Sequence, residues 1–280
     1  MAHEPGHNGA EGIPEEQVRK VRLGGMALRN GLLVHGPEHW AIAVRTGDGS
    51  IKVDSGRKPR LRGPLADLPG VRGVARLSEA FALLPLIKRQ VPEVRLPFED
   101  GRMIAAMLAS SLLSAGVRRG GRTAGREGVL TLLGIAPAAL ALKDSELAAY
   151  HGVEHKAIAA YEEDGDAADA LKEHDRCGSH LVAPMLATAT FGNVAARRAG
   201  LRGPAAEAAV GVGSAAVAVE VFAWSERHPD SALTRLLRRP GHEIQRAVGT
   251  REPTSEQLEV GRAALAEILR VEPAPAQPDR

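Results

Sequence analysis

The chain is poor in cysteine and in aromatic residues, and both shortages narrow what the protein can be. Cys177 is the only cysteine among 280 residues, which excludes an internal disulfide framework. A lone thiol suits a reducing compartment or a metal site. Aromatic residues make up 3% of the sequence, so alanine, leucine and valine must fill most of the core. These residues favour closely packed helices.

Several familiar signals are also missing. No phosphate-binding loop, dinucleotide fingerprint or internal repeat occurs, and the formal net charge of +2 predicts no nucleic-acid partner. No secretory signal is evident, because residues 1–20 are polar and rich in glycine, proline and glutamate. We expect this segment and the proline-rich residues 272–280 to be disordered tails.

Long hydrophobic runs are scarce, although four shorter apolar stretches occur at 103–117, 128–142, 178–196 and 208–224. A membrane-spanning helix needs about twenty apolar residues, and only the third stretch approaches that length. Alanine contributes little to insertion, so buried soluble helices and short membrane helices both remain open. Glu220 is the only charge in the last stretch. We expect it to have a partner there, either an arginine in a structural ion pair or a metal.

The order of turn residues and apolar runs along the chain predicts a mainly α fold with a small N-terminal β-hairpin or sheet. Apolar runs at 40–45 and 50–54 flank a Gly-Asp-Gly turn, which predicts a hairpin within a β-containing region, 21–76. An alanine-rich helical bundle, expected to be membrane-associated, follows over 77–226. Amphipathic helices then follow over 227–271.

Within these regions the predicted helices cover 145–161, 167–172, 233–237 and a final segment opened by Thr254. Pro240 and Gly241 are expected to stop the third of them. The apolar stripe of the last helix predicts packing against the core or against a second copy of the chain.

The most informative stretch is Tyr150-His151-Gly152-Val153-Glu154-His155-Lys156. On a helix, His151 and His155 project from one face, one turn apart, a spacing at which two imidazoles can bind one divalent ion. Glu154 shares that face and could take a proton from a metal-bound water. The order H-x-x-E-H is that of inverted zinc peptidases.

A second cluster follows about twenty residues later. His174 and Cys177 add an imidazole and a thiolate, and the four side chains make a tetrahedral N/S set suited to Zn²⁺. If only three of them bind, a coordination position stays open for water and a hydrolase is expected. If all four bind, the site is closed and becomes a structural clasp. The alternative to metal binding is a metal-free interaction protein. In that case the helix is solvated and carries surface histidines, His174 is a capping residue and Cys177 is a small buried residue.

With these residues in hand, the sequence resembles the YqhQ-like family of predicted metal-dependent enzymes of bacterial membranes. The resemblance implies a multi-pass protein of the bacterial inner membrane, in contact with membrane lipids, with the metal motif between helices. It covers about residues 22–270 and is carried by Gly24-Gly25, Gly36-Pro37, the segments 68–74 and 150–156, Arg176-Cys177-Gly178, Pro240-Gly241, Gln245-Arg246 and the segments 250–253 and 257–260.

The chain departs from this family pattern at Asn30, where a Glu is usual, and at His35, where an Arg is usual. Asp175 and Ser179 replace a Pro and a Thr. The four candidate ligands are retained. The sequence therefore predicts a membrane-associated zinc hydrolase with Glu154 as general base, and the alternative is a scaffold or assembly factor held together by a zinc clasp.

Overall fold

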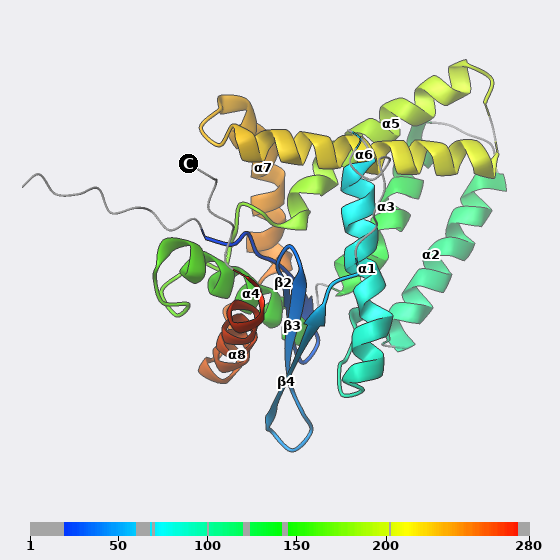
Figure 1. Ribbon diagram of the computed structural model, residues 1–280. Helices are drawn as coiled ribbons and strands as arrows, with labels where there is room; N and C mark the ends of the chain where they lie inside the picture. Colours follow the sequence, from blue (N-terminus) through cyan, green and yellow to red (C-terminus); the bar gives the residue numbers. More distant parts are fainter. Residues whose placement is uncertain are drawn as a thin grey trace, which may run out of the picture.

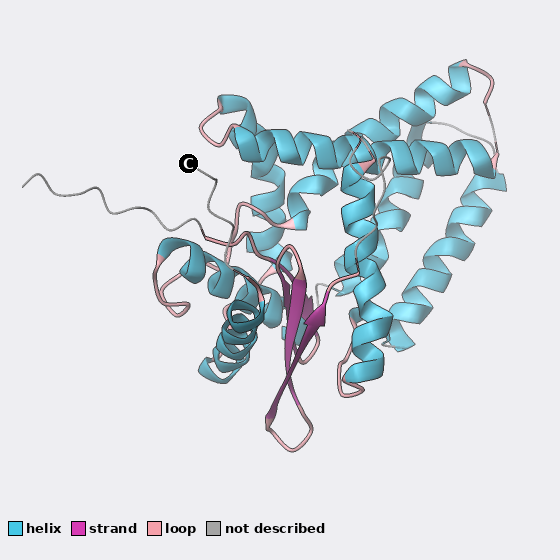
Figure 2. Ribbon diagram, in the orientation of Figure 1, coloured by secondary structure: helices cyan, strands magenta, loops and turns pink. Residues whose placement is uncertain are grey.

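The computed structural model describes residues 20–59, 68, 71–99, 101–119, 124–141, 145–201 and 203–273. These residues form a small antiparallel sheet and eight α-helices, so the mainly α prediction is confirmed (Figures 1 and 2). The strands are β1 (Gly24–Leu28), β2 (Gly31–His35), β3 (His39–Arg45) and β4 (Ile51–Arg57). The helices are α1 (Arg72–Gln90), α2 (Gly101–Arg119), α3 (Ala124–Ala141), α4 (Ser145–Glu163), α5 (Val182–Arg198), α6 (Pro204–Arg227), α7 (Ala232–Ile244) and α8 (Ser255–Val271).

The sheet is a four-stranded meander in the order β1-β2-β3-β4. The predicted hairpin is confirmed as β3 and β4, with His39 opposite Arg57 and Arg45 opposite Ile51. Gly49 has a φ of 87° in its turn, a conformation that glycine adopts readily. Two short apolar runs upstream extend the hairpin as β1 and β2, so β1 and β4 form the two edges of the sheet.

Each face of the sheet is covered by helices because apolar side chains occur on both sides of the central strands. One face carries Leu32, Val34, Ala41 and Ala43, and packs against α4 and α8. The opposite face packs against α1, and Figure 1 shows α1 on the far side of the sheet from α4 and α8. Its buried residues include Leu33, Trp40, Ile42, Val44, Leu83 and Ile87.

The helix α4 lies very close to its neighbours, because glycines remove the side chains at its contacts. A Cβ added at Gly152 would lie 2.3 Å from the carbonyl oxygen of Arg251, just before α8. A Cβ added at Gly261 of α8 would lie 2.4 Å from Val153. Since α4 also packs on β1, these contacts set the position of the histidine motif relative to the sheet edge.

The predicted start of the last helix is confirmed. Thr254 caps α8, and the Thr254 and Gln257 side chains and backbones form a reciprocal capping box. Leu258, Val260, Ala264 and Ile268 are buried in the core, so the stripe packs within the chain.

Glu267 of α8 has a carboxyl group whose pKa is strongly lowered. Hydrogen bonds from Arg270 and Ser55 lower the pKa of Glu267 from 4.5 to about 2.

Two helix predictions are wrong. Residues 167–172 form turns, because Asp166 accepts the Ala168 N–H at 2.8 Å, and Lys156 Nζ binds the carbonyls of Ala168 and Ala170 that a helix would use. The helix at 233–237 does not stop at Pro240. It continues as α7 to Ile244 and then opens into a π-helical turn, η4 (Gln245–Gly249).

The expected tails at 1–19 and 274–280 lie outside the described residues, but both inner boundaries shift. Lys20 donates hydrogen bonds from Nζ to the carbonyls of Tyr161 and Glu162 at 2.7 and 2.9 Å. Glu272 is buried and accepts the backbone N–H of His39 at 2.7 Å. Residues 20 and 272 therefore belong to the folded part.

All four apolar stretches contain helices, namely α2, α3, α5 and α6, which extend away from the sheet (Figure 1). The third stretch opens with a 3₁₀ turn, η3 (Gly178–Leu181), so the 17-residue α5 is shorter than the run suggested. Within the described parts of the chain, α6 is the one helix long and apolar enough to cross a membrane. Its 24 residues contain a window of mean hydropathy 1.5 of which only 11% is buried.

Candidate metal centre

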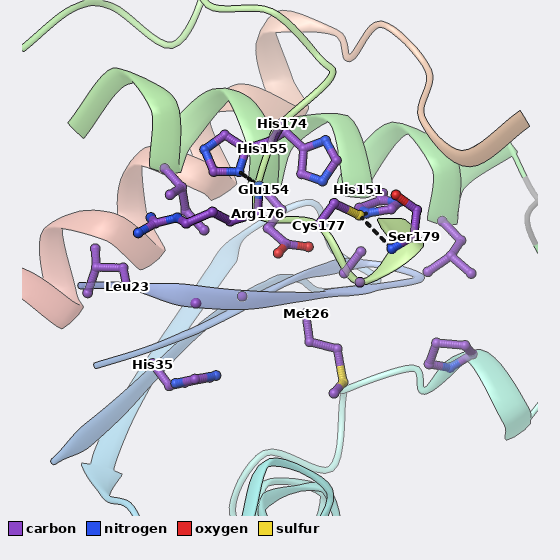
Figure 3. Close-up of a pocket in the computed structure, with 17 residues that line it drawn as sticks. Leu23, Met26, His35, His151, Glu154, His155, His174, Arg176, Cys177 and Ser179 are labelled. Carbon is purple, nitrogen blue, oxygen red and sulfur yellow. Dashed lines mark hydrogen bonds between the residues drawn. The ribbon is translucent and has the colours of Figure 1, made fainter. Parts of the chain in front are cut away.

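Three of the four candidate ligands converge on one point. His151 and His155 face the same side of α4, and Cys177 approaches from the N-cap of η3 (Figure 3). One ligand atom from each of the three lies within 4.8 Å of the others. The Cys177 Sγ is 3.3 Å from His151 Nε2, and the two imidazole centroids are 4.4 Å apart. The structure therefore brings together two nitrogens and one sulfur from segments 26 residues apart in sequence.

Both histidines of α4 are held by the nitrogen that faces away from this cluster. His151 Nδ1 lies 2.7 Å from the Gly249 carbonyl, and His155 Nδ1 lies 2.6 Å from the Lys172 carbonyl. A carbonyl oxygen only accepts, so each Nδ1 carries the proton and donates. In each ring, Nε2 is then the nitrogen directed toward the cluster, as in histidines that bind metal ions.

The Nε2 atom of His155 gives the strongest indication of a metal site. It is buried and has no hydrogen-bond partner among the described residues. Burial and the neighbouring His151 lower the pKa of His155 to about 3, so its imidazole stays neutral at physiological pH and keeps the lone pair. A buried polar atom without a partner costs about 1 to 3 kcal/mol. A cation between the three side chains would satisfy it, so the donor set fits a divalent ion of the zinc type.

Cys177 and His151 are linked electrostatically. The buried Cys177 sulfur accepts the Ser179 N–H at 3.5 Å. Burial alone would lower the pKa of His151, but its contact with Cys177 and the charge of Glu154 outweigh burial and raise that pKa to about 9. Without a cation, His151 therefore holds a proton on Nε2 beside the Cys177 sulfur, and a bound cation would replace that proton.

His174 stands beside this group and is not one of its three members. Its ring centroid is 5.7 Å from that of His155. Its Nδ1 accepts the Arg176 N–H at 3.2 Å, so Nε2 carries the proton and donates to Glu162 at 3.3 Å. Glu162 is paired with this imidazole and with the Arg176 guanidinium.

Glu154 lies where the sequence motif predicts, between α4 and the strand β1 (Figure 3). Burial raises the pKa of its carboxyl, although His151, His174 and a hydrogen bond from the Ala27 backbone N–H oppose the rise. A Cβ added at Gly25 would lie 2.6 Å from Glu154 Cγ and 2.7 Å from its Oε1. The missing side chain at Gly25 therefore makes the space that this carboxylate occupies.

A cavity of about 460 Å³ opens beside these side chains. Its walls are the strand β1, the side of α4 that carries the two histidines and Glu154, and the loop that carries Cys177. The lining residues are Leu23, Gly24, Gly25, Met26, Ala27, His35, Pro97, Leu147, His151, Glu154, His155, Ile158, His174, Arg176, Cys177, Gly178 and Ser179.

His35 and Asn30, the two N-terminal residues that differ from the family pattern, lie in different parts of the fold. His35 lines the cavity, and burial together with Lys58 lowers its pKa to about 4. Asn30 supports the fold. Its side-chain nitrogen donates to the carbonyls of Arg45 and Glu93, both at 2.9 Å, and its oxygen accepts the Arg95 N–H. Glu220 lines a separate apolar pocket between α6 and α7, away from the three-residue group.

Sequence reasoning missed the groups that orient the ligands. Gln245 is fully buried, accepts the His174 N–H at 2.7 Å and donates to Ser179 Oγ at 2.8 Å, so it ties the ligand loop to η4. The carbonyls of Lys172 and Gly249 carry no signal in the sequence because every residue has one. Gln245 did stand in a segment shared with the resembling family, and that was its only signal.

A family model described as "Protein of unknown function (DUF1385)" matches residues 141–271, which is 131 of the 280 residues. The matched part is similar to this uncharacterised family and contains α4, the ligand loop and α5 to α8. No curated protein and no solved structure matches the chain. The match agrees with a resemblance to YqhQ-like proteins and carries no information on activity.

Proposed function

We propose that this protein is a metal-dependent hydrolase in which His151, His155 and Cys177 bind a divalent ion, most suitably Zn²⁺. The observation that supports this proposal is the buried His155 Nε2, which lacks a partner and is directed at the other two ligand atoms. Three protein ligands rather than four are typical of catalytic zinc sites, which keep one position for water.

Glu154 is the general base of this proposal. A bound zinc ion would lower the pKa of a water molecule toward neutrality. Glu154 is placed to take the proton from that water, because it shares the helix face of the ligands and its carboxylate lines the same cavity. Burial raises its pKa, which brings the carboxyl closer to the range where it can both accept and return a proton.

A structural zinc clasp is the second candidate, and the position of His174 is the observation that favours it. Its ring centroid lies 5.7 Å from that of His155, and a change of its ring orientation would bring in a fourth ligand. The two candidates differ in whether His174 binds the ion.

Metal stoichiometry in matched variants distinguishes the two candidates. We expect one zinc per chain in the wild type and in His174→Ala. The variants His155→Ala and Cys177→Ala should bind zinc far more weakly, since removal of a direct ligand exceeds the roughly 10- to 100-fold cost of an outer-shell change. A cobalt-substituted protein should show thiolate-to-metal absorption that Cys177→Ala removes. His228→Ala is the matched control, because His228 stacks on Trp224 outside the cavity.

A protein without stoichiometric metal would refute both candidates. Loss of zinc in His174→Ala to the same degree as in His155→Ala would favour the clasp over the hydrolase.

We further propose that α6 anchors the protein in a membrane. An apolar helix of a soluble core is mostly buried, whereas the apolar window of α6 is 11% buried and Val212 on it is 60% exposed. The helices α2, α3 and α5 also expose large apolar side chains, such as Leu112, Leu132 and Phe191. Exposed apolar surface on this scale is typical of contact with lipid or another protein.

Fractionation of cells tests the anchor. The wild-type chain should stay with membranes after alkaline carbonate washing. Val212→Asp should release it, since a central aspartate costs roughly 2.5 to 3.5 kcal/mol in a membrane helix. Leu171→Asp, on a 73% exposed residue of a turn, should have no such effect. Recovery of the wild type in the soluble fraction would contradict the proposal.

A further inference from the structure

The strand β1 presents a free edge to the cavity of the candidate metal centre. It pairs only with β2, and its other side has no strand neighbour in the sheet. Residues 24–27 are partly exposed, and all four line the cavity that also contains Glu154 and the three candidate ligands. The free edge and the ligand cluster are therefore two walls of one space.

The register of β1 shows which backbone groups point into this space. Leu28 pairs with Gly31 across a two-residue turn, so Leu28, Met26 and Gly24 exchange hydrogen bonds with β2. The alternate residues, Gly25 and Ala27, direct their N–H and C=O groups away from β2. The Ala27 N–H lowers the pKa of the Glu154 carboxyl, which agrees with this parity.

The remaining outward groups of β1 are suited to a peptide backbone. The N–H and C=O of Gly25 and the C=O of Ala27 are spaced as a strand presents them, and no other described strand pairs with them. Edge strands with unpaired groups bind extended peptides by adding a strand. Gly25 has no side chain that would obstruct this approach.

We propose, building on the hydrolase function above, that the substrate is an extended polypeptide segment that adds to β1 as a further strand. Backbone hydrogen bonds to Gly25 and Ala27 hold the segment in register, which places one of its carbonyls beside Glu154 and the ligand cluster. The apolar side chains of Leu23, Met26, Leu147 and Ile158 line the same cavity and suit apolar residues of the segment.

The lining favours a peptide over an anionic ligand such as a lipid phosphate. Arg176 is the one arginine or lysine of the lining, and its guanidinium is already paired with Glu162. Among the buried side-chain atoms of the lining, His155 Nε2 and one nitrogen of Arg176 make no hydrogen bond, and the outward backbone groups of Gly25 and Ala27 line the same cavity. These backbone groups complement another backbone better than they complement a phosphate.

The reaction is hydrolysis of a peptide bond by water. The water oxygen bonds to the peptide carbonyl carbon, and the C–N bond breaks. Glu154 takes one proton from the water and passes it to the leaving nitrogen. The second water proton then moves from the new carboxyl group to the amine, so the products are a carboxylate and an ammonium group.

The test uses the full chain in detergent, loaded with zinc, and a fluorogenic library of random decapeptides. We expect cleavage within peptides. The best substrate is then N-methylated one residue at a time, because an N-methyl group removes one backbone donor. If the peptide adds to β1 as a strand, N-methylation at alternate positions should weaken binding at least tenfold. N-methylation at the positions between them should have little effect. Equal effects at consecutive positions would overturn the strand geometry.

A second measurement does not depend on catalysis. In the Glu154→Gln variant, which leaves the peptide intact, hydrogen exchange at the Gly25 N–H should slow at least tenfold when the best peptide is added. Amides of β4, the other edge of the sheet, serve as the internal control and should not change. Lack of protection at Gly25 would overturn the inference, with or without metal.

The failure of this inference differs from the failure of the proposed function. A zinc-loaded chain that hydrolyses p-nitrophenyl acetate through Glu154, cleaves no peptide and shows no protection at Gly25 would remain a hydrolase, and the inference would fall. A chain that binds no zinc would refute the hydrolase. Protection of the Gly25 N–H in that chain would still support peptide binding at β1.

Discussion

Replacement of Gly25 by alanine tests the contact between the sheet edge and the candidate base. The new Cβ would lie 2.6 Å from Glu154 Cγ and 2.7 Å from Oε1, whereas unstrained carbon pairs lie about 3.5 to 4.0 Å apart. The carboxylate must therefore move by about 1 Å. A displacement of that size can cost about a hundredfold in rate. Zinc content should stay unchanged, because the three atoms nearest to the new Cβ all belong to Glu154 and not to a ligand.

The same substitution has a calculable effect on stability. Overpacking of this kind typically costs about 1 to 3 kcal/mol. The lower entropy of an unfolded chain with alanine returns about 0.4 to 1 kcal/mol. The free energy of unfolding should therefore fall by up to about 2.5 kcal/mol, which corresponds to at most roughly 10 °C in thermal unfolding.

Gly24→Ala is the matched control for this prediction. The three atoms nearest to its Cβ would all belong to the ring of His35, the first at 3.0 Å, on the opposite face of β1 from Glu154. We measure thermal unfolding, zinc content and hydrolysis of the best library peptide in both variants. If Gly25→Ala matched the wild type in stability and rate, the placement of Glu154 against β1 would be wrong.

Three further predictions follow from other contacts. Gly152→Ala should lower the free energy of unfolding by at least about 1 kcal/mol in denaturant titration, because its Cβ would lie 2.3 Å from the Arg251 carbonyl. Gly213→Ala, which has open space in α6, should instead raise that free energy by up to about 1 kcal/mol. Gln245→Ala should weaken zinc binding about 10- to 100-fold in chelator competition with all ligands present, since it frees the ligand loop. Unchanged affinity would show that the loop does not need this side chain. The depressed pKa of Glu267, about 2 against 4.5, stabilises the fold above pH 4.5, and this contribution disappears as the pH falls from about 4.5 to about 2. Acid unfolding of Glu267→Gln should lack this component, and an unaltered acid transition would contradict it.

The sequence by itself determined the local elements and the identity of the candidate ligands. The hairpin of β3 and β4 followed from its Gly-Asp-Gly turn, and α8 followed from the capping residues at Thr254. The helical spacing of His151 and His155 placed their imidazoles on one face before any tertiary contact was known. Local rules were sufficient there because turns, caps and helix faces depend on residues only a few positions apart.

Tertiary contacts decided where those rules failed. The turns at 167–172 form because Lys156, from the preceding helix, binds two of their carbonyls. The helix α7 passes Pro240, and Gly241 packs there on the ring of His180.

The three-dimensional arrangement also decided which candidate ligands converge. His174 and Cys177 stand three residues apart in the sequence and are equivalent as ligand candidates by spacing alone. In the fold, Arg176 and Glu162 engage the ring of His174, whereas Cys177 faces His151 and the unpartnered nitrogen of His155. Gln245 and the Gly249 carbonyl, about seventy or more residues further on, hold this arrangement. Contacts over such separations depend on the packing of whole helices, which no local pattern encodes.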